Sequence, residues 1–481
     1  MAVLEHLEPK GVFSFFEQLC AIPHGSRNTR AVSDWCVAFA RERGLEWYQD
    51  AWNNVILIQQ ATPGYEDASA VILQGHLDMV CEKELGCTKD MEREGLELAV
   101  EDGFVLARGT TLGGDDGIAV AMALAVLDDA SIPHPRLEVV LTTEEEIGML
   151  GAAELDVSPL RGRQLINLDS EAEGVFTVGC AGGSLTRCTL PLRREPFAGT
   201  ALCLRVSGLV GGHSGEEIDR GRANANVLLG RLLVKMGAAG EMRLISLSGG
   251  SKDNAIPTSA VATLMAADPA AARQAAEKLA EELKREYRAT EPGLCVTVET
   301  APKGAIAAMD AASTRRVLCL LACAPNGVQE MSREIPGMVQ TSLNLGILQS
   351  GEDALEAVFC VRSSVASQKE MLHDRLRCLT ETLGGAVDIS GDYPAWEFRP
   401  DSPLRERMAE VFREQYGREP RVETIHAGLE CGLLCGKLPG LDCVSIGPDI
   451  ADIHTPREHM SIASVQRVWA LLLEVLKRSK A

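Results

Sequence analysis

The sequence lacks the features that are typical of several large protein classes, and each absence excludes a class of function. It has 47 lysine and arginine residues against 68 aspartate and glutamate residues, so it lacks the positive charge that binding to a nucleic-acid backbone requires. No stretch reaches the roughly 20 apolar residues of a membrane-spanning helix. Glu5 and His6 stand where a secretion signal would have lysine or arginine before an apolar run. We therefore expect a protein that binds neither nucleic acid nor membrane.

The sequence contains 15 cysteines, an odd number, scattered through segments that otherwise have the pattern of a buried core. In a long chain without a secretion signal, such cysteines are typical of small buried hydrophobic residues rather than of disulfides. The expected compartment is therefore the reducing cytoplasm.

The length and the first third of the chain predict an α/β domain. At 481 residues the chain exceeds one ordinary core, which favours two domains. Short branched apolar runs predict strands at 70–75, 136–143 and 164–168, and the alanine-rich segment 116–127 predicts a helix. Strands that alternate with helices indicate a mostly parallel sheet with helices on both faces.

From about residue 182 the pattern changes to alternating strands and amphipathic helices. Strands are expected at 200–207, 261–267, 294–299, 340–347 and 357–363, and helices at 223–236, 270–288 and 368–383. This order predicts antiparallel sheets with helices packed on one face. Residues 385–399, which contain glycine, aspartate and proline, are expected to form a linker back to the first domain.

We therefore predict a discontinuous domain interrupted by an insertion. The α/β domain is expected to comprise residues 1–181 and 395–481, ending in a helix at 464–477. The inserted α+β domain is expected to comprise residues 182–394.

His76 and Asp78 follow directly on the predicted strand at 70–75. Residues two apart on an extended chain point to the same side, so the two side chains can touch. A metal-bound imidazole commonly donates its other N–H to a carboxylate, which fixes its orientation. Alone, a His-x-Asp pair is a weak signal, and a solvated loop pair is its ordinary explanation.

A glycine-rich turn carries Asp115 and Asp116 at the start of the helix predicted at 116–127. Capping and the helix dipole explain one aspartate at a helix N-terminus, but they do not explain two beside a glycine pair. A phosphate-binding loop is excluded by charge, because two aspartates would repel a phosphate.

Two further acidic clusters follow predicted strands. Glu144, Glu145 and Glu146 end one strand, and Asp169 ends another. Adjacent carboxylates at the end of a buried strand are costly unless a cation neutralises them, and the alternative is a solvated acidic turn. Because open α/β sheets bind ligands at the carboxyl ends of their strands, the clusters predict one common site, to which the distant His454 could return. Histidine and carboxylate donors without thiolate suit zinc, cobalt or manganese.

Together these motifs resemble the ordered signature of the co-catalytic zinc aminoacylase/carboxypeptidase superfamily. Three further motifs narrow the resemblance to the bacterial aminoacyl-histidine dipeptidases, also termed Xaa-His or beta-alanyl-histidine dipeptidases. These motifs are Gly-Gly-His213-Ser-Gly, His426-Ala-Gly-Leu-Glu-Cys-Gly and Gly-Gly-Ser-Lys-Asp-Asn254-Ala-Ile-Pro. The resemblance covers essentially the whole chain.

The resemblance implies a zinc-peptidase catalytic domain with an inserted lid domain that supports a homodimer. It also implies two zinc ions per chain, for which cobalt or manganese could substitute. His76 and Asp169 would hold one ion, Glu146 and His454 would hold the other, and Asp115 would bridge them.

The resemblance also implies roles for two groups beside the metals. Asp78 would orient His76, and Glu145 would be the general base that takes a proton from water and returns it to the leaving amine. Two points of register stay open: Asp116 in place of Asp115 as the bridge, and a shift by one position within the three glutamates.

The implied substrates are small peptides, in particular dipeptides of the Xaa-His type, including beta-Ala-His. A tripeptide aminopeptidase or an acyl-amino-acid deacylase of the same superfamily is the alternative enzyme, and a peptide-binding homologue without activity is the alternative of another class. His213 is expected to contact the substrate or its oxyanion, in its own or a partner subunit's site, unless it is a simple polar turn residue. His426 and Asn254 are further candidates, and Arg362 could pair with a substrate carboxylate or form a structural ion pair.

Overall fold

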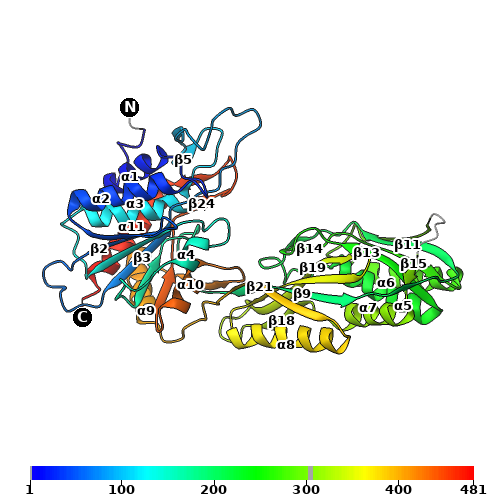
Figure 1. The fold of residues 1–481 in the computed structure, drawn as a ribbon. Coiled ribbons are helices and arrows are strands. Elements are labelled where there is room, and N and C mark those ends of the chain that lie inside the picture. Colours follow the sequence, from blue (N-terminus) through cyan, green and yellow to red (C-terminus); the bar gives the residue numbers. More distant parts are fainter. Residues whose placement is uncertain (1–2, 302–306, 481) are drawn as a thin grey trace. The chain divides into compact units, whose positions relative to one another are not determined.

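The computed structural model describes residues 3–301 and 307–480, which form two compact units (Figure 1). The first unit comprises Met1–Gly179, Phe398–Thr424 and Leu429–Ala481, as far as these are described. The second comprises the described part of Cys180–Glu397, together with Ile425–Gly428. Each unit has its own sheet and its own helices.

A mixed sheet forms the centre of the first unit. Its strands, in the order in which they lie side by side, are β1 (Glu46–Gln49), β2 (Val55–Gln59), β6 (Leu137–Thr142), β3 (Val71–His76), β7 (Gln164–Asn167), β23 (Asp442–Ser445), β8 (Val175–Cys180) and β22 (Arg421–Ile425). Strands β6, β3, β7 and β23 pair in parallel, whereas β1, β2 and β8 pair antiparallel. The parallel order expected from the sequence thus lies at the centre of the sheet, where all residues of β3 and β6 are buried.

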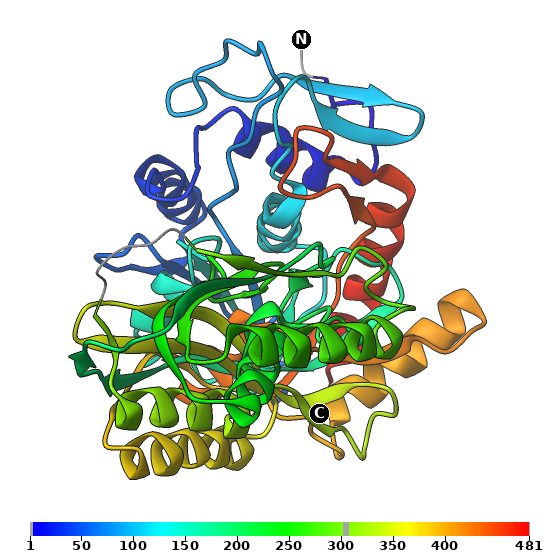
Figure 2. The ribbon, with the colours of Figure 1, turned by 90° about the vertical axis from the view of Figure 1, so that its right-hand side faces the viewer.

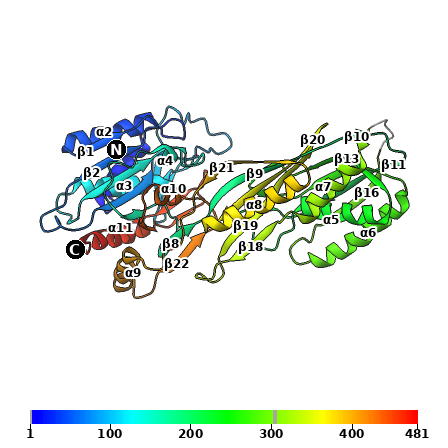
Figure 3. The ribbon, with the colours of Figure 1, turned by 60° about the horizontal axis from the view of Figure 1, so that its bottom comes forward.

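Helices cover this sheet and explain the burial of its central strands (Figures 1 and 3). They are α1 (Lys10–Cys20), α2 (Arg30–Arg43), α3 (Gly114–Asp128), α4 (Leu150–Glu154), α9 (Pro403–Tyr416), α10 (Glu430–Lys437) and α11 (Ile462–Lys477). Helix α3 packs on β3 with α1 against it, and α9 packs on β23 with α11 against it. Residues 114–127 of α3 are all buried, as its alanine-rich sequence predicts. Among the described residues, no helix combines the length and the apolar character needed to cross a membrane.

A small second sheet ties the C-terminal segment to the loop before α3 (Figure 2). Its strands are β24 (Ile450–Ala451), β25 (His459–Ser461), β5 (Phe104–Ala107) and β4 (Leu98–Glu101). In Figure 2 the light-blue hairpin of β4 and β5 lies beside the red C-terminal strands. The loop that carries His454 is therefore held at both of its ends, by β24 and by β25.

The main sheet of the second unit is antiparallel in all its described pairings (Figure 3). Its strands in order are β16 (Cys295–Thr300), β11 (Thr200–Ser207), β15 (Ala260–Ala266), β13 (Met242–Gly249), β19 (Val339–Ser350), β20 (Ala354–Ser363), β9 (Gly182–Pro191) and β21 (Ala386–Tyr393), with β18 (Gly327–Met331) also paired to β19. Two short ribbons complete the unit: β10 (Arg194–Glu195) with β17 (Ala308–Met309), and β12 (Gly212–His213) with β14 (Ala255–Ile256).

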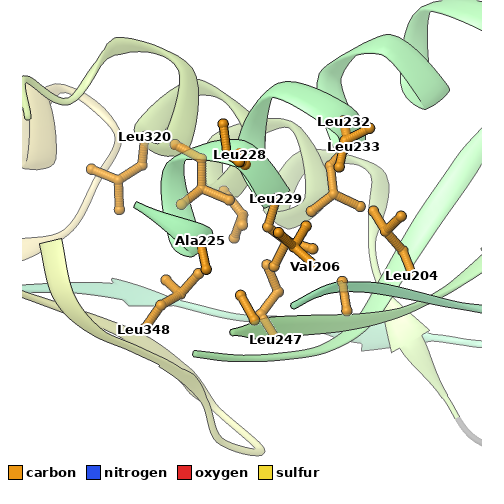
Figure 4. Packing of buried hydrophobic residues seen from close by; sticks show 14 of the residues in the cluster. Leu204, Val206, Ala225, Leu228, Leu229, Leu232, Leu233, Leu247, Leu320 and Leu348 are labelled. Carbon is orange, nitrogen blue, oxygen red and sulfur yellow. The ribbon is translucent and has the colours of Figure 1, made fainter. Parts of the chain in front are cut away.

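Four helices pack against this sheet and bury an aliphatic core. They are α5 (Ala225–Ala239), α6 (Pro269–Glu286), α7 (Ala311–Cys323) and α8 (Ala366–Thr382). In Figure 4, Leu228 and Leu229 of α5 lie over Val206, Leu247 and Leu348 of the strands. Each fully buried leucine contributes about 1.5–3 kcal/mol through the area it removes from water, so this layer stabilises the unit.

One expectation from the sequence is wrong: residues 385–399 are not simply a linker. Their first half forms β21, which pairs with β9 along most of its length. The alternating exposure of this strand fits an edge position, with Gly391 and Asp392 at its less regular end. Glycine and aspartate made the segment resemble a loop, whereas an edge strand tolerates both because one side meets water.

Candidate metal centre

His76 is the last residue of β3 and is almost fully buried. Its Nδ1 lies 2.9 Å from the backbone carbonyl of Asp78 and 3.6 Å from the Asp78 carboxylate. A proton on Nδ1 therefore donates to the carbonyl, which leaves Nε2, 3.2 Å from Oδ1 of Asp115, as the nitrogen that a metal ion would take. The contact between His76 and Asp78 expected from the sequence is present, and its shortest distance is to the backbone oxygen.

The carboxylate of Asp115 lies between two imidazoles. Its Oδ1 is 3.2 Å from Nε2 of His76, and its Oδ2 is 3.2 Å from Nε2 of His454. Asp116, by contrast, accepts a hydrogen bond from the backbone N–H of His76 at 3.1 Å. Of the two aspartates, Asp115 is thus the one whose two oxygens face two different histidines.

The three glutamates after β6 point to different places. Glu144 accepts hydrogen bonds from the backbone N–H of Arg27 at 2.8 and 2.9 Å, so its carboxylate holds the loop before α2. The Asp78 carboxylate accepts the backbone N–H of Glu145 at 3.1 Å and that of Glu146 at 3.4 Å. These contacts fix the turn, and the side chains of Glu145 and Glu146 join the cluster around His76.

His454 reaches this cluster from the far end of the sequence. Its Nε2 lies 3.0 Å from either oxygen of Glu146. Its backbone is left-handed, with φ at 59°, and Asp452 shares that conformation at 53°. Such backbone costs about 1–3 kcal/mol per residue and persists only where surrounding contacts hold it, as the strands at both ends of this loop do.

The donor atoms form overlapping groups in which all atoms lie within 4.8 Å of one another. The groups are His76 with Asp116 and Asp169, His76 with Glu145 and Glu146, Asp115 with Glu146 and His454, and Asp115 with Asp169 and Glu171. All five predicted metal ligands therefore lie in one place, together with the predicted base.

Electrostatics favours a cation at this place. Burial raises the pKa of Glu145 to about 8, and repulsion from Glu430 and Glu146 adds to the effect. Burial and the charge of Asp116 also raise the pKa of Asp169 well above its ordinary value. Buried carboxylates that repel one another are stabilised by a nearby positive charge.

The donor set fits a divalent metal ion rather than the charged side chain of a lysine or an arginine. Imidazole nitrogens and carboxylate oxygens, without thiolates, are the ligands that zinc, cobalt or manganese accept. Hydrogen bonds to Asp115 and Glu146 raise the pKa of His454 to about 10. An imidazole that carboxylates hold so strongly is positioned where a metal ion would take the place of its proton.

The predicted substrate residues lie in the second unit, and three of them converge around Gly215. A Cβ built on Gly215 would lie 3.1 Å from Cε1 of His213 and 3.2 Å from Nε of Arg362. It would also lie 2.4 Å from the backbone oxygen of His426, so only glycine fits here. Asn254 joins them through its backbone carbonyl, which accepts the N–H of Ser214 at 2.9 Å.

The side chains of this cluster keep unused hydrogen-bonding capacity. Nη1 of Arg362 donates to the hydroxyl of Tyr393 at 3.1 Å, whereas Nε of Arg362 and Nδ1 of His426 are buried without a partner among the described residues. Nε2 of His426 lies 2.7 Å from Oγ of Ser342. Burial lowers the pKa of His426 to about 3, and the charge of Arg362 adds to this, so the imidazole is neutral. The cluster therefore carries one buried positive charge, which an anionic group would stabilise.

Two acidic residues of the first unit escaped the sequence analysis. Glu171 lies beside Asp115 and Asp169, and a signal existed, because residues 169 and 171 are two apart on an extended segment and can share a side. Glu430 is fully buried and accepts hydrogen bonds from Gln74 at 2.6 Å and Thr142 at 2.5 Å. Glu430 stands in the motif that begins at His426, but the motif did not show its role, since its partners lie 356 and 288 residues away.

Comparison with known proteins places the chain in a family. The model of peptidase family M20/M25/M40 matches residues 72–478. The chain is 38% identical to the cytosol non-specific dipeptidase of Escherichia coli (strain K12) over 485 residues, with 100% of both chains covered. Among solved structures, an aminoacylhistidine dipeptidase from Vibrio alginolyticus matches with a TM-score of 0.94 and 35% identity, covering 99% of this chain and 98% of that one.

A more distant structure agrees on the fold alone. A tripeptidase from Staphylococcus aureus matches with a TM-score of 0.55 and 16% identity, covering 98% of this chain and 99% of that one. The resemblance inferred from the motifs is confirmed by the full-length relatives. The chain belongs to peptidase family M20/M25/M40, a metal-dependent family of peptide-bond hydrolases.

Proposed function

We propose that the chain is a dipeptidase that works with two divalent metal ions, zinc in the first place, and that Xaa-His dipeptides such as beta-Ala-His are among its substrates. Two relatives that match it over the full length at 35% identity or more are described as dipeptidases, one non-specific and one for aminoacyl-histidine. The observation that carries the two-metal proposal is the carboxylate of Asp115, whose two oxygens each lie 3.2 Å from a different imidazole.

The proposed ligands divide into two sets around Asp115. His76 and Asp169 would hold one ion, and Glu146 and His454 would hold the other. When bound, two such ions lower the pKa of water and polarise the scissile carbonyl. Cobalt and manganese accept the same donors and are proposed as substitutes.

The remaining chemistry belongs to the side chains. Asp78 keeps the proton of His76 on Nδ1, because the Asp78 carbonyl accepts it at 2.9 Å. Glu145 takes the proton of the attacking water and passes it to the leaving amine. Its carboxylate lies in the same group of donor atoms as His76 and Glu146, so Glu145 is placed to hold that proton between the two transfers.

We propose that the cluster around Gly215 binds the carboxylate of the dipeptide. Arg362 supplies the charge, and its Nε has no partner among the described residues. His213 is half-buried, and its neutral imidazole can donate a hydrogen bond to an anion or to a developing oxyanion. His426 and Asn254 complete the proposed contacts.

We further propose that the chain works as a homodimer through the second unit and acts in the cytoplasm. The E. coli relative is described as a cytosol enzyme, which supports the second point. Sedimentation equilibrium of the full chain tests the first. A monomer at micromolar concentration would contradict the dimer.

Elemental analysis of the purified protein tests the metal proposal. We expect about two zinc equivalents per chain, loss of dipeptidase activity with a chelator, and recovery with zinc, cobalt or manganese. Full activity in a protein without bound metal would overturn the proposal.

A substrate panel tests the dipeptidase assignment against its neighbours. The panel contains beta-Ala-His, Gly-His, dipeptides without histidine, a tripeptide and an acyl-amino acid. We expect dipeptides to have the highest kcat/KM. Faster turnover of the tripeptide or the acyl-amino acid would favour the alternative enzymes, and no turnover at all would favour a binding protein.

A further inference from the structure

Glu458 lies in the loop between the proposed ligand His454 and strand β25, and only 2% of its surface is exposed. Its carboxylate accepts hydrogen bonds from four successive backbone N–H groups at the start of α3. Oε2 accepts from residues 112 and 113 at 2.7 and 3.0 Å, and Oε1 accepts from residues 114 and 115 at 2.8 and 3.3 Å. One side chain thus holds the whole turn that presents Asp115.

The charge of Glu458 is stabilised by amide dipoles. Four N–H groups that point at one carboxylate form an anion-binding concavity. Hydrogen bonds to a charged acceptor are stronger than those between neutral groups, and removing this acceptor would leave several buried donors unpaired. The conformation of residues 112–115 therefore depends on Glu458 more than on a residue that makes a single contact with them.

The glycine pair before Asp115 is explained by this contact. Gly113 has a left-handed φ of 66°, and a Cβ there would lie 2.8 Å from Sδ of Met79. A Cβ on Gly114 would lie 3.2 Å from Oε1 of Glu458. Two residues without side chains let four amides converge on one carboxylate.

We infer that Glu458 is a positioning residue that couples the loop of His454 to the turn of Asp115 and so sets the metal affinity of the centre. The inference rests on the proposed function. Glu458 lies four residues after His454, and its carboxylate contacts the backbone N–H of Asp115 itself. One carboxylate thus links the turn of the proposed bridge to the loop that carries one ligand of the second proposed ion.

The test compares Glu458→Gln and Glu458→Asp with a matched control, Glu138→Gln. Glu138 is equally buried, lies at the opposite end of the central strands on β6, and also accepts backbone N–H groups, from Arg161 and Gly162. The amide introduced by Glu458→Gln would turn an N–H₂ group toward backbone donors that need an acceptor, whereas Glu458→Asp keeps the charge on a shorter side chain. Circular dichroism selects the variants that fold.

Two measurements are made on each variant. Amide hydrogen exchange of residues 112–115 is measured in metal-free protein, and zinc affinity is measured by competition with a chromophoric chelator. We expect Glu458→Gln to exchange more than about tenfold faster and to bind zinc about 10–100-fold more weakly. Glu458→Asp should fall between this variant and wild type, and Glu138→Gln should match wild type in both.

A folded Glu458→Gln protein with wild-type exchange and zinc affinity would overturn the inference. So would equal losses in Glu458→Gln and Glu138→Gln, because they would report general destabilisation. A wild-type protein that binds zinc but hydrolyses no peptide would remove the proposed function and leave the inference on Glu458 intact. A wild type that binds no divalent ion would overturn the coupling to metal affinity as well.

Discussion

In the first unit, the residues around Asp115 are buried ionisable groups whose positions are set by directional contacts. In the second unit, the layer between α5 and the sheet is aliphatic, with Leu229, Val206 and Leu247 in contact (Figure 4). The first arrangement depends on which donor meets which acceptor, and the second depends on how much apolar area is removed from water. A substitution in the cluster around Asp115 should therefore change chemistry, and one in the aliphatic layer of the second unit should change stability.

The polar clusters of the two units also differ. In the first unit, Asp78, Glu144 and Glu458 each accept backbone N–H groups, so the turns that carry the proposed ligands are held without any ligand. In the second unit, Arg362 and His426 each keep a buried nitrogen without a partner among the described residues. Buried polar atoms are usually paired. The first cluster is thus prearranged, whereas under the proposed function the second would gain its missing contacts from the substrate.

The largest expected effect is loss of turnover in Glu145→Gln. Glutamine is nearly isosteric with glutamate but cannot take up a proton, so kcat should fall by about 10²–10⁴-fold or more. Metal content should stay near that of wild type, because the proposed ligands are unchanged. Steady-state kinetics and elemental analysis measure both quantities.

The neighbouring variant Glu144→Gln is the matched control. Its carboxylate accepts the backbone N–H of Arg27 rather than joining the cluster around His76. Its kcat should stay within about tenfold of wild type, since the lost contact belongs to a loop. A larger loss in Glu144→Gln than in Glu145→Gln would mean that Glu145 is not the base.

The outline of the site could be predicted from the sequence because its residues follow regular elements. The strand expected at 70–75 is β3, and the helix expected at 116–127 lies within α3, Gly114–Asp128. Once parallel strands are expected, clusters at their carboxyl ends must meet. The pattern alone therefore predicts that His76, Glu146 and Asp169 lie near one another.

The contacts that hold these residues could not be predicted. Glu458 contacts the turn before Asp115 across 343–346 positions of sequence, and nothing local marks it as an acceptor of four amides. Strand β21 was missed because its pattern is that of an exposed edge. Local periodicity reveals elements with a buried face, whereas long-range hydrogen bonds and edge strands are decided by the assembled fold.

In the second unit, Leu229→Ala should act on stability alone. The side chain is fully buried in the core of that unit, so its truncation should cost about 2–5 kcal/mol through lost burial and the cavity left behind. Urea unfolding followed by circular dichroism measures the loss, and metal content should not change. The exposed Val210→Ala serves as control and should alter stability by less than about 0.5 kcal/mol. Loss of bound metal in folded Leu229→Ala would break the contrast between the two units.

Arg362→Ala should act on catalysis rather than on metal content. A hydrogen bond from a charged group contributes about 1.5–3 kcal/mol, so kcat/KM for dipeptides should fall about 10–100-fold, mainly through KM. The exposed Arg187→Ala, which breaks only an ion pair with Glu356 between strands, should retain wild-type kinetics. A substrate with an amidated C-terminus should be insensitive to Arg362→Ala. Equal losses for the free and the amidated peptide would contradict carboxylate binding by Arg362.

The smallest expected effect is a pH dependence of stability from His426. Burial lowers the pKa of His426 to about 3 in the folded protein, and Arg362 and His213 face it and add to the shift. In the unfolded chain this histidine takes up a proton near pH 6.5. The stability that comes from its neutral form is therefore fully present above that pH and is lost as the pH falls toward 3. When the pH is lowered from 8 to 5.5, this histidine should therefore reduce the free energy of unfolding by about 1.4 kcal/mol. Glutamine at this position cannot titrate. In His426→Gln, the difference in the free energy of unfolding by urea between the two pH values should therefore be smaller by that amount. An unchanged difference would mean that His426 does not remain neutral in the folded protein.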